Sequence, residues 1–183
     1  MASLNQLINR PLITAMAIPL VSGGLVASLT SPNELVNRTW YTTLDGPSWR
    51  VPAKLFAPMN MAFYAAMGYG SYLVWREGRI HPGLDVTPPL RLYGLNLLLT
   101  LAWPPLFFQQ KNLTLATASA WLVTITTALL GDGFYSANTT AGWLMTPSLV
   151  WTAYKAVLTS AFWWTNRKAA GAPRGVSSAD LKP

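Results

Sequence analysis

The sequence predicts an all-α protein, a membrane-spanning bundle of five transmembrane helices, and three observations favour this class. The chain of 183 residues is 51% hydrophobic and only 10% charged, whereas an average soluble domain is roughly 25% charged. Its apolar residues gather into runs, each close to the ~20 residues that cross a ~30 Å hydrocarbon core. Nine tryptophans lie among and between these runs, and indole suits both a pocket lining and the level of the lipid headgroups.

The five spans are expected at about residues 12–29, 55–75, 90–108, 113–130 and 141–164. The first has Arg10 ahead of it, as a signal peptide would, yet it begins late and contains Pro19. The later spans need no separate targeting signal, so we expect the first helix to be retained. Prolines inside a span, as in Trp103-Pro104-Pro105, give up backbone hydrogen bonds that lipid does not replace. Repeated beside tryptophan, this pattern favours a compact bundle that holds a flat or bulky apolar ligand.

The second span carries a stripe of small residues, because Ala62, Ala66 and Gly70 recur at every fourth position. Small residues at this spacing let another helix backbone approach closely. The stripe indicates either packing inside the bundle or a face for a homodimer or another membrane protein.

The connections differ in length and composition. Residues 31–53 form a lid loop rich in Pro, Asn, Asp and Trp. Loops of this length are functional or disordered, and Trp40, Tyr41 and Trp49 indicate that this one folds back onto the bundle. Residues 77–89, 109–112 and 131–140 are expected to be short or turn-rich links. Residues 167–183 form a basic tail that we expect to be disordered.

The net charge of +7 is interpreted as a topology signal rather than as a nucleic-acid-binding surface, and no nucleic-acid partner is expected. With five spans, one side of the membrane holds Arg38, Arg50, Lys54, Lys111, Arg167, Lys168, Arg174 and Lys182, and the other holds Arg10, Arg76, Arg79 and Arg91. Cytosolic segments carry the excess of Lys and Arg. The C-terminus is therefore expected in the cytosol, and the N-terminus across the membrane.

No pattern in the sequence predicts a metal centre, a cofactor or a catalytic group. The chain has no cysteine, so disulfides, thiol nucleophiles and thiolate metal sites are excluded. His81 is the single histidine, which rules out a multi-histidine metal site. The six carboxylates lie mostly in loops and form no close pair of the kind that glycoside hydrolases use. These features favour a protein that is not an enzyme.

Four stretches of the chain resemble the translocator protein family, also called tryptophan-rich sensory proteins or peripheral-type benzodiazepine receptors. The run from Tyr64 to Glu77 is especially similar to animal members. The other three, in the family's order, are Trp40-Tyr41 with Pro47-Ser48-Trp49, Leu90–Phe108 with its Trp103-Pro104-Pro105, and Pro147 with Trp151 and Leu158. The resemblance covers roughly Pro19 to Asn166. Four stretches in order, combined with five spans, make it specific.

The resemblance implies a five-helix bundle whose cavity opens toward the cytosol beneath the first long loop. Family members bind porphyrins, sterols and aromatic drugs there, and in eukaryotes their usual home is the outer mitochondrial membrane. The expected function is therefore a receptor or carrier for porphyrins or cholesterol, with a role in their transport. Two alternatives stay open, a porphyrin-degrading or sensing enzyme and a membrane scaffold. The pocket positions that match the family are Trp49, Pro58, Tyr64, Trp103, Phe107, Phe108, Trp151 and Leu158, and Leu122 and Lys155 are two further candidate ligand-binding residues.

The chain departs from the family pattern at several pocket positions. Lys54 and Asn60 stand where tryptophan is usual, Thr100 replaces an asparagine and Lys155 replaces a small residue. The cavity is expected to be narrower and more cationic, so drug-type ligands should bind poorly. A lysine well inside a span costs at least ~2.5 kcal/mol unless it snorkels or finds a partner. Lys155 either binds a ligand carboxylate, such as a porphyrin propionate, or reaches the interface or hydroxyl partners such as Thr159.

The cholesterol-binding pattern that often ends the family's last helix is broken here. The corresponding positions read Leu158, Ser160 and Trp164 instead of Leu, Tyr and Arg. Such patterns are weak even when complete, so sterol binding is expected from family analogy alone.

Overall fold

The computed structural model describes the backbone of residues 2–30 and 35–171, and the side chains of residues 10–30 and 35–167. Six α-helices follow one another: α1 (Ala2–Thr30), α2 (Leu35–Thr43), α3 (Phe56–Ile80), α4 (Thr87–Pro104), α5 (Leu113–Ala137) and α6 (Thr139–Gly171). A 3-10 turn, η1 (Ala53–Leu55), precedes α3, and a π-helical turn, η2 (Pro105–Gln109), follows α4. These ranges contain no strand, which confirms the all-α class.

The expected count of five helices is wrong, because the predicted lid loop contains a sixth helix, α2. This helix has nine residues and a mixed composition, so it produces no apolar run that a hydropathy pattern detects. It forms because one face, with Asn37 and Tyr41, is buried against the rest of the protein. Residues 35–53 are called the lid below.

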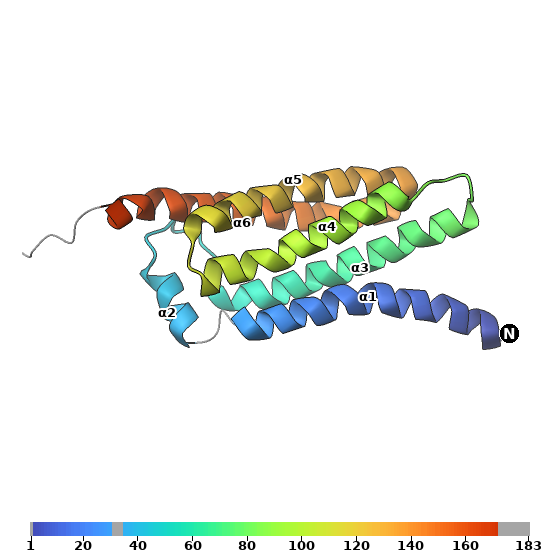
Figure 1. Ribbon diagram of the computed structural model, residues 1–183, viewed down its shortest axis with the longest axis horizontal. Helices are drawn as coiled ribbons and strands as arrows, with labels where there is room; N and C mark the ends of the chain where they lie inside the picture. Colours follow the sequence, from blue (N-terminus) through green and yellow to red (C-terminus); the bar gives the residue numbers. More distant parts are fainter. Residues whose placement is uncertain (1, 31–34, 172–183) are drawn as a thin grey trace, which may run out of the picture.

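The five long helices lie side by side, and α2 lies across one end of them (Figure 1). α5 and α6 pack against each other along their length on one side of the bundle, whereas α1 lies on the opposite side against α3 and α4. The end that carries α2 is called the lid end. The α3–α4 and α5–α6 connections lie at the opposite end.

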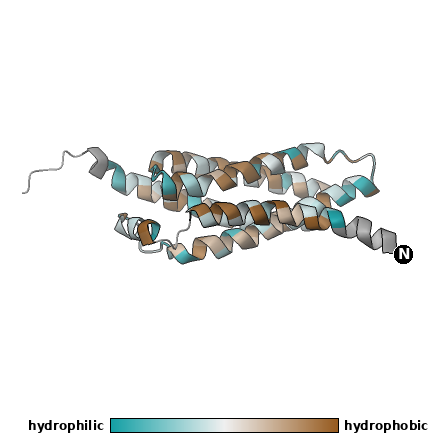
Figure 2. Cartoon of the chain, turned by 60° about the horizontal axis from the view of Figure 1, so that its bottom comes forward, coloured by the Kyte–Doolittle hydropathy of each residue, from teal (hydrophilic) through white to brown (hydrophobic). Residues whose placement is uncertain are grey.

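Large apolar side chains are exposed along the outside of the bundle, and Figure 2 shows hydrophobic residues along the long helices. α1 exposes Ile13, Ile18, Val21, Leu25 and Leu29, and α5 exposes Leu115, Trp121, Leu122, Ile125 and Leu129. By length and hydropathy, Arg10–Thr30 and Leu113–Ala137 qualify as membrane spans on their own. Apolar surface of this extent is typical of contact with lipid rather than water.

Small residues of α3 let its neighbours approach. A Cβ added to Gly70 would lie 3.2 Å from both Met145 Cε of α6 and Phe134 Cε2 of α5, and one added to Gly68 would lie 2.6 Å from the Ala15 carbonyl oxygen of α1. Gly70 is therefore used for packing inside the bundle. Ala62, at the start of the predicted stripe, is exposed, and a homodimer stays a prediction.

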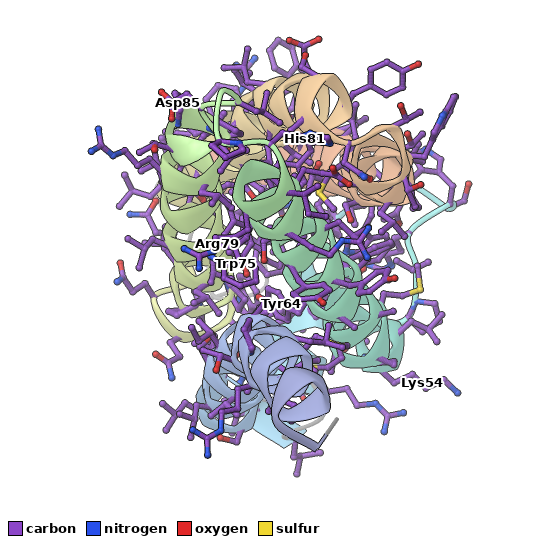
Figure 3. All side chains as sticks on the ribbon, turned by 90° about the vertical axis from the view of Figure 1, so that its right-hand side faces the viewer. Lys54, Tyr64, Trp75, Arg79, His81 and Asp85 are labelled. Carbon is purple, nitrogen blue, oxygen red and sulfur yellow. The ribbon has the colours of Figure 1, made fainter. Side chains whose placement is uncertain are left out.

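Apart from the buried Lys155, the basic residues whose side chains the structure describes fall into two groups, one at each end of the bundle. Arg38, Arg50, Lys54, Lys111 and Arg167 belong to the lid end, and Arg10, Arg76, Arg79 and Arg91 belong to the opposite end. Figure 3 looks along the bundle from that opposite end, where Arg79, His81 and Asp85 are labelled. Which end faces the cytosol stays a prediction. α6 continues to Gly171, and residues 172–183 of the predicted tail lie outside the described residues.

Candidate ligand-binding site

An aromatic cluster fills the lid end of the bundle, and Phe56 at the start of α3 lies at its centre. The Phe56 ring stacks on Trp103 of α4 at 5.9 Å between centroids, and it lies 5.7 Å from the Trp151 ring of α6. Its edge contacts reach Phe108 at 6.1 Å and Tyr41 of the lid at 5.9 Å. Four separate elements thus meet at one side chain.

The proline pair after Trp103 shapes the second part of the cluster. Proline has no N–H to donate, and the chain widens after Pro104 into the π-helical turn, where Gln110 N donates to the Pro105 oxygen at 2.9 Å. Both Phe107 and Phe108 are buried in this turn. Phe107 stacks on Trp103 at 4.9 Å and 12°, and Phe108 meets Phe107 edge-on at 4.9 Å.

The lid covers this cluster through its own aromatic residues. Trp40 lies edge-on to Phe107 at 5.1 Å, and Tyr41 lies edge-on to Phe162 of α6 at 5.5 Å. The Tyr41 hydroxyl donates to the Val51 oxygen at 2.8 Å. Burial raises the pKa of Tyr41 above its ordinary range, so the phenol stays protonated and keeps this hydrogen bond.

Trp49 joins the cluster only at its edge. Its side chain is 49% exposed, and its ring meets Tyr154 of α6 edge-on at 5.7 Å. Tyr154 in turn stacks on Trp151 at 5.4 Å and accepts a hydrogen bond from Val51 N at 2.9 Å. Tyr154 therefore connects the lid to the cluster.

The polar atoms of three side chains meet directly beneath the aromatic rings, and Asn60 of α3 accepts hydrogen bonds from the other two, Trp151 and Lys155. Asn60 Oδ1 accepts from Trp151 Nε1 at 2.9 Å and from Lys155 Nζ at 3.4 Å. Lys155 is 3% exposed, and its Nζ lies 5.1 Å from the centre of the Trp103 ring. Thr159 Oγ1 donates to the backbone carbonyl of Lys155, and within the described residues the Lys155 ammonium donates to Asn60 rather than to Thr159. Of the alternatives left open for Lys155, reach to the interface is contradicted, because the side chain is buried against Asn60 of α3 and Trp103 of α4.

Two small cavities lie between these side chains. The first, about 20 Å³, is bounded by α1, Phe56, Asn60, Tyr64 and Trp103. The second, about 10 Å³, is bounded by Asn60, Tyr64, Ser148, Trp151 and Lys155. Asn60 and Tyr64 line both. Within the described part of the chain, Trp103 Nε1 and Ser148 Oγ are buried without a hydrogen-bond partner, and each of these residues lines one of the two cavities.

The structure brings most of the predicted site residues together, but not all of them. Those buried at the lid end or beside the cavities are Tyr64, Trp103, Phe107, Phe108, Trp151, Lys155 and Leu158. Pro58 is exposed on the first turn of α3, and Leu122 is 51% exposed on the outer face of α5. The inward face of α5 carries Ala120 and Val123 instead, so Leu122 does not reach the cavities.

Sequence reasoning missed the residue at the centre of the cluster. Phe56, Asn60 and Tyr64 recur at every fourth position, which places them on one face of α3. Because Tyr64 is a predicted site residue, this spacing indicates from the sequence that Phe56 and Asn60 share its face of the helix. Tyr154 and Phe162 gave no comparable signal, because their role depends on where the lid lies.

Comparisons with known proteins identify relatives of this chain. The model of the TspO/MBR family matches residues 15–165. The chain is 37% identical to the translocator protein of Homo sapiens over 127 residues, which cover 69% of this chain and 75% of that protein. It is 36% identical to the translocator protein of Sus scrofa over 136 residues, 74% of this chain and 79% of that one. Tryptophan-rich protein TspO of Bacillus cereus is 28% identical over 130 residues, 71% and 80% of the two chains.

Proposed function

The chain belongs to the TspO/MBR family, whose members are integral membrane proteins, and on that premise we propose that it is a membrane receptor or carrier for flat, hydrophobic ligands. Porphyrins and sterols such as cholesterol are the ligand classes that we propose, in agreement with the resemblance described above. The proposed site is the aromatic cluster at the lid end together with the two cavities beside it.

One observation carries this proposal, the buried and unpartnered N–H of Trp103 beside a cavity walled by aromatic rings. A buried donor without an acceptor costs about 1–3 kcal/mol. A ligand that offers an acceptor at this place would remove that cost. Its flat body would exchange ring contacts with Phe56 and Trp103, and such contacts are worth ~0.5–1.5 kcal/mol beyond burial.

Binding requires protein side chains to move. Cavities of about 20 and 10 Å³ are far smaller than the roughly 300–1,000 Å³ of a typical ligand pocket. The rings of Phe56 and Trp103 fill the intervening space. Two elements are free to make room, namely the lid, which is held by a few hydrogen bonds, and α1, whose apolar segment is only 11% buried.

We further propose that the protein resides in the outer mitochondrial membrane with its C-terminus in the cytosol. The names of the mammalian relatives support translocation of a ligand as its role. The cation-rich lid end supports a cytosolic position for the lid, because cytosolic segments carry the excess of Lys and Arg. The lipid bilayer is then the constant partner of the exposed apolar faces.

The first experiment is a titration of the detergent-solubilised protein with protoporphyrin and, separately, with cholesterol, followed by tryptophan fluorescence. We expect saturable quenching by protoporphyrin that weakens at least fivefold for Trp151→Leu, since a lost stacking contact of ~1 kcal/mol corresponds to about that factor. Trp143→Leu is the matched control, because Trp143 lies on the same helix and is 65% exposed on its outer side. It should leave the affinity unchanged.

Other results would favour the alternatives. Loss of the porphyrin absorption band under light would favour the enzyme that degrades porphyrin. No saturable response to either ligand would contradict the receptor and leave a scaffold that acts through helix contacts.

A further inference from the structure

We propose that Lys155, Asn60 and Ser148 form a carboxylate-binding subsite, so that the cavity selects ligands that carry an acid over neutral ones such as sterols. This inference rests on the proposed function and specifies the chemistry of its ligand.

The first argument is a buried cation without a counter-ion. Lys155 is 3% exposed, and among the described residues it forms no ion pair. Within the described residues, the only hydrogen bond of its Nζ is the 3.4 Å contact with Asn60 Oδ1, an atom that already accepts from Trp151 Nε1 at 2.9 Å. No described Asp or Glu lines either cavity. A buried charge in low dielectric requires compensation by an opposite charge or by good hydrogen bonds.

The second argument is an excess of donors around the same space. Ser148 is 2% exposed, and its hydroxyl has no hydrogen-bond partner among the residues that the structure describes. It lies seven residues before Lys155 on α6, two helical turns away on the same inward face, and both side chains line the second cavity. Trp103 Nε1 is a further buried donor without an acceptor. A carboxylate supplies two acceptor oxygens and a negative charge, whereas a sterol hydroxyl supplies neither the charge nor the second oxygen.

The third argument is the geometry of the two cavities. The second cavity, of about 10 Å³, has room for little more than one small polar group. The first cavity lies on the other side of Asn60 and Tyr64, among the aromatic rings. A ligand whose flat body displaces the rings in the first cavity would extend its acid past Asn60 toward Lys155. The subsite thus fits a carboxylate at the end of a short aliphatic substituent, such as the propionate of a porphyrin.

The test compares protoporphyrin with its dimethyl ester, which keeps the ring and removes both charges. The wild-type protein should bind the free acid about tenfold or more tightly than the ester, because hydrogen bonds to charged groups are the strong ones. Lys155→Met should abolish this preference, so that the free acid and the ester bind to the variant with equal affinity. This variant should fold, since replacing a buried charge with an apolar side chain is often neutral or stabilising.

Two further variants sharpen the result. Arg91→Met removes an exposed cation at the opposite end of the bundle, away from both cavities, and should keep the preference for the acid, which controls for net charge. Ser148→Ala should reduce the preference without abolishing it. Equal binding of acid and ester by the wild type, or a preference that survives Lys155→Met, would overturn the subsite and leave the receptor intact. Saturable binding of neither compound would overturn both proposals.

Discussion

Asn166 near the end of α6 pairs with the backbone of Asp45 in the lid in both directions. Its Nδ2 donates to the Asp45 oxygen at 2.8 Å, and its Oδ1 accepts from Asp45 N at 3.2 Å. Thr165 Oγ1 donates to the same oxygen at 2.6 Å. One residue of the lid is therefore fixed to the end of α6, directly beside the contact between Tyr41 and Phe162.

Removing this pair should loosen the lid. In Asn166→Ala we expect both the association and the dissociation of protoporphyrin to become faster, because the hydrogen bonds that close the lid contribute about 1 kcal/mol together when partly exposed. Stopped-flow fluorescence measures both rates. Ser136→Ala is the control, since this exposed hydroxyl bonds only within α5. Unchanged rates in Asn166→Ala would show that the ligand does not pass the lid.

A glycine pair on α1 tests how closely this helix approaches the site. A Cβ added to Gly23 would collide with the Tyr64 ring, whereas one added to Gly24 meets nothing within 4 Å. Gly23→Ala should destabilise the protein by about 1–3 kcal/mol, as overpacking does. Gly24→Ala should be neutral or stabilising by at most about 1 kcal/mol. Thermal unfolding in detergent compares the two, and equal midpoints would contradict the α1–α3 contact.

The link between Asn60 and Lys155 should appear as an energetic coupling. Asn60→Leu leaves Trp151 Nε1 and Lys155 Nζ without their shared acceptor, and we expect it to cost about 2 kcal/mol or more. In a Lys155→Met background the same change should cost about 1 kcal/mol less, because only the indole then loses its partner. Unfolding by SDS titration of the wild type, the two single variants and the double variant gives the double-mutant cycle. Additive effects would mean that the 3.4 Å contact contributes nothing.

The absence of cysteine from the chain allows the orientation in the membrane to be measured with single introduced thiols. We expect Thr42→Cys, exposed in α2, to react with an impermeant maleimide from the cytosolic side of intact mitochondria. Gly83→Cys, in the α3–α4 connection with open space around it, should react only after the membrane is permeabilised. The reverse pattern would contradict the orientation inferred from the distribution of Lys and Arg.

The helical class and the family were predictable from the sequence, because apolar runs and proline-tryptophan patterns are local properties. α2 was not, since its nine residues become helical through burial of Tyr41 and Asn37 against distant elements. The same difference applies to the site. Trp103, Phe107 and Phe108 follow one another along the chain and were identified, whereas Phe56 and Tyr154 depend on packing between α3, α6 and the lid.

The sequence by itself determined that the chain forms a helical membrane bundle and belongs to the TspO/MBR family, because composition and residue order suffice for both. Only the tertiary structure decided which way side chains face. It directed Leu122 toward the outside of α5, and it enclosed Lys155 between Asn60 and the Trp103 ring. The physical reason is that the direction of a side chain depends on the rotation of its helix against its neighbours, and close contacts such as Gly23 against Tyr64 set that rotation.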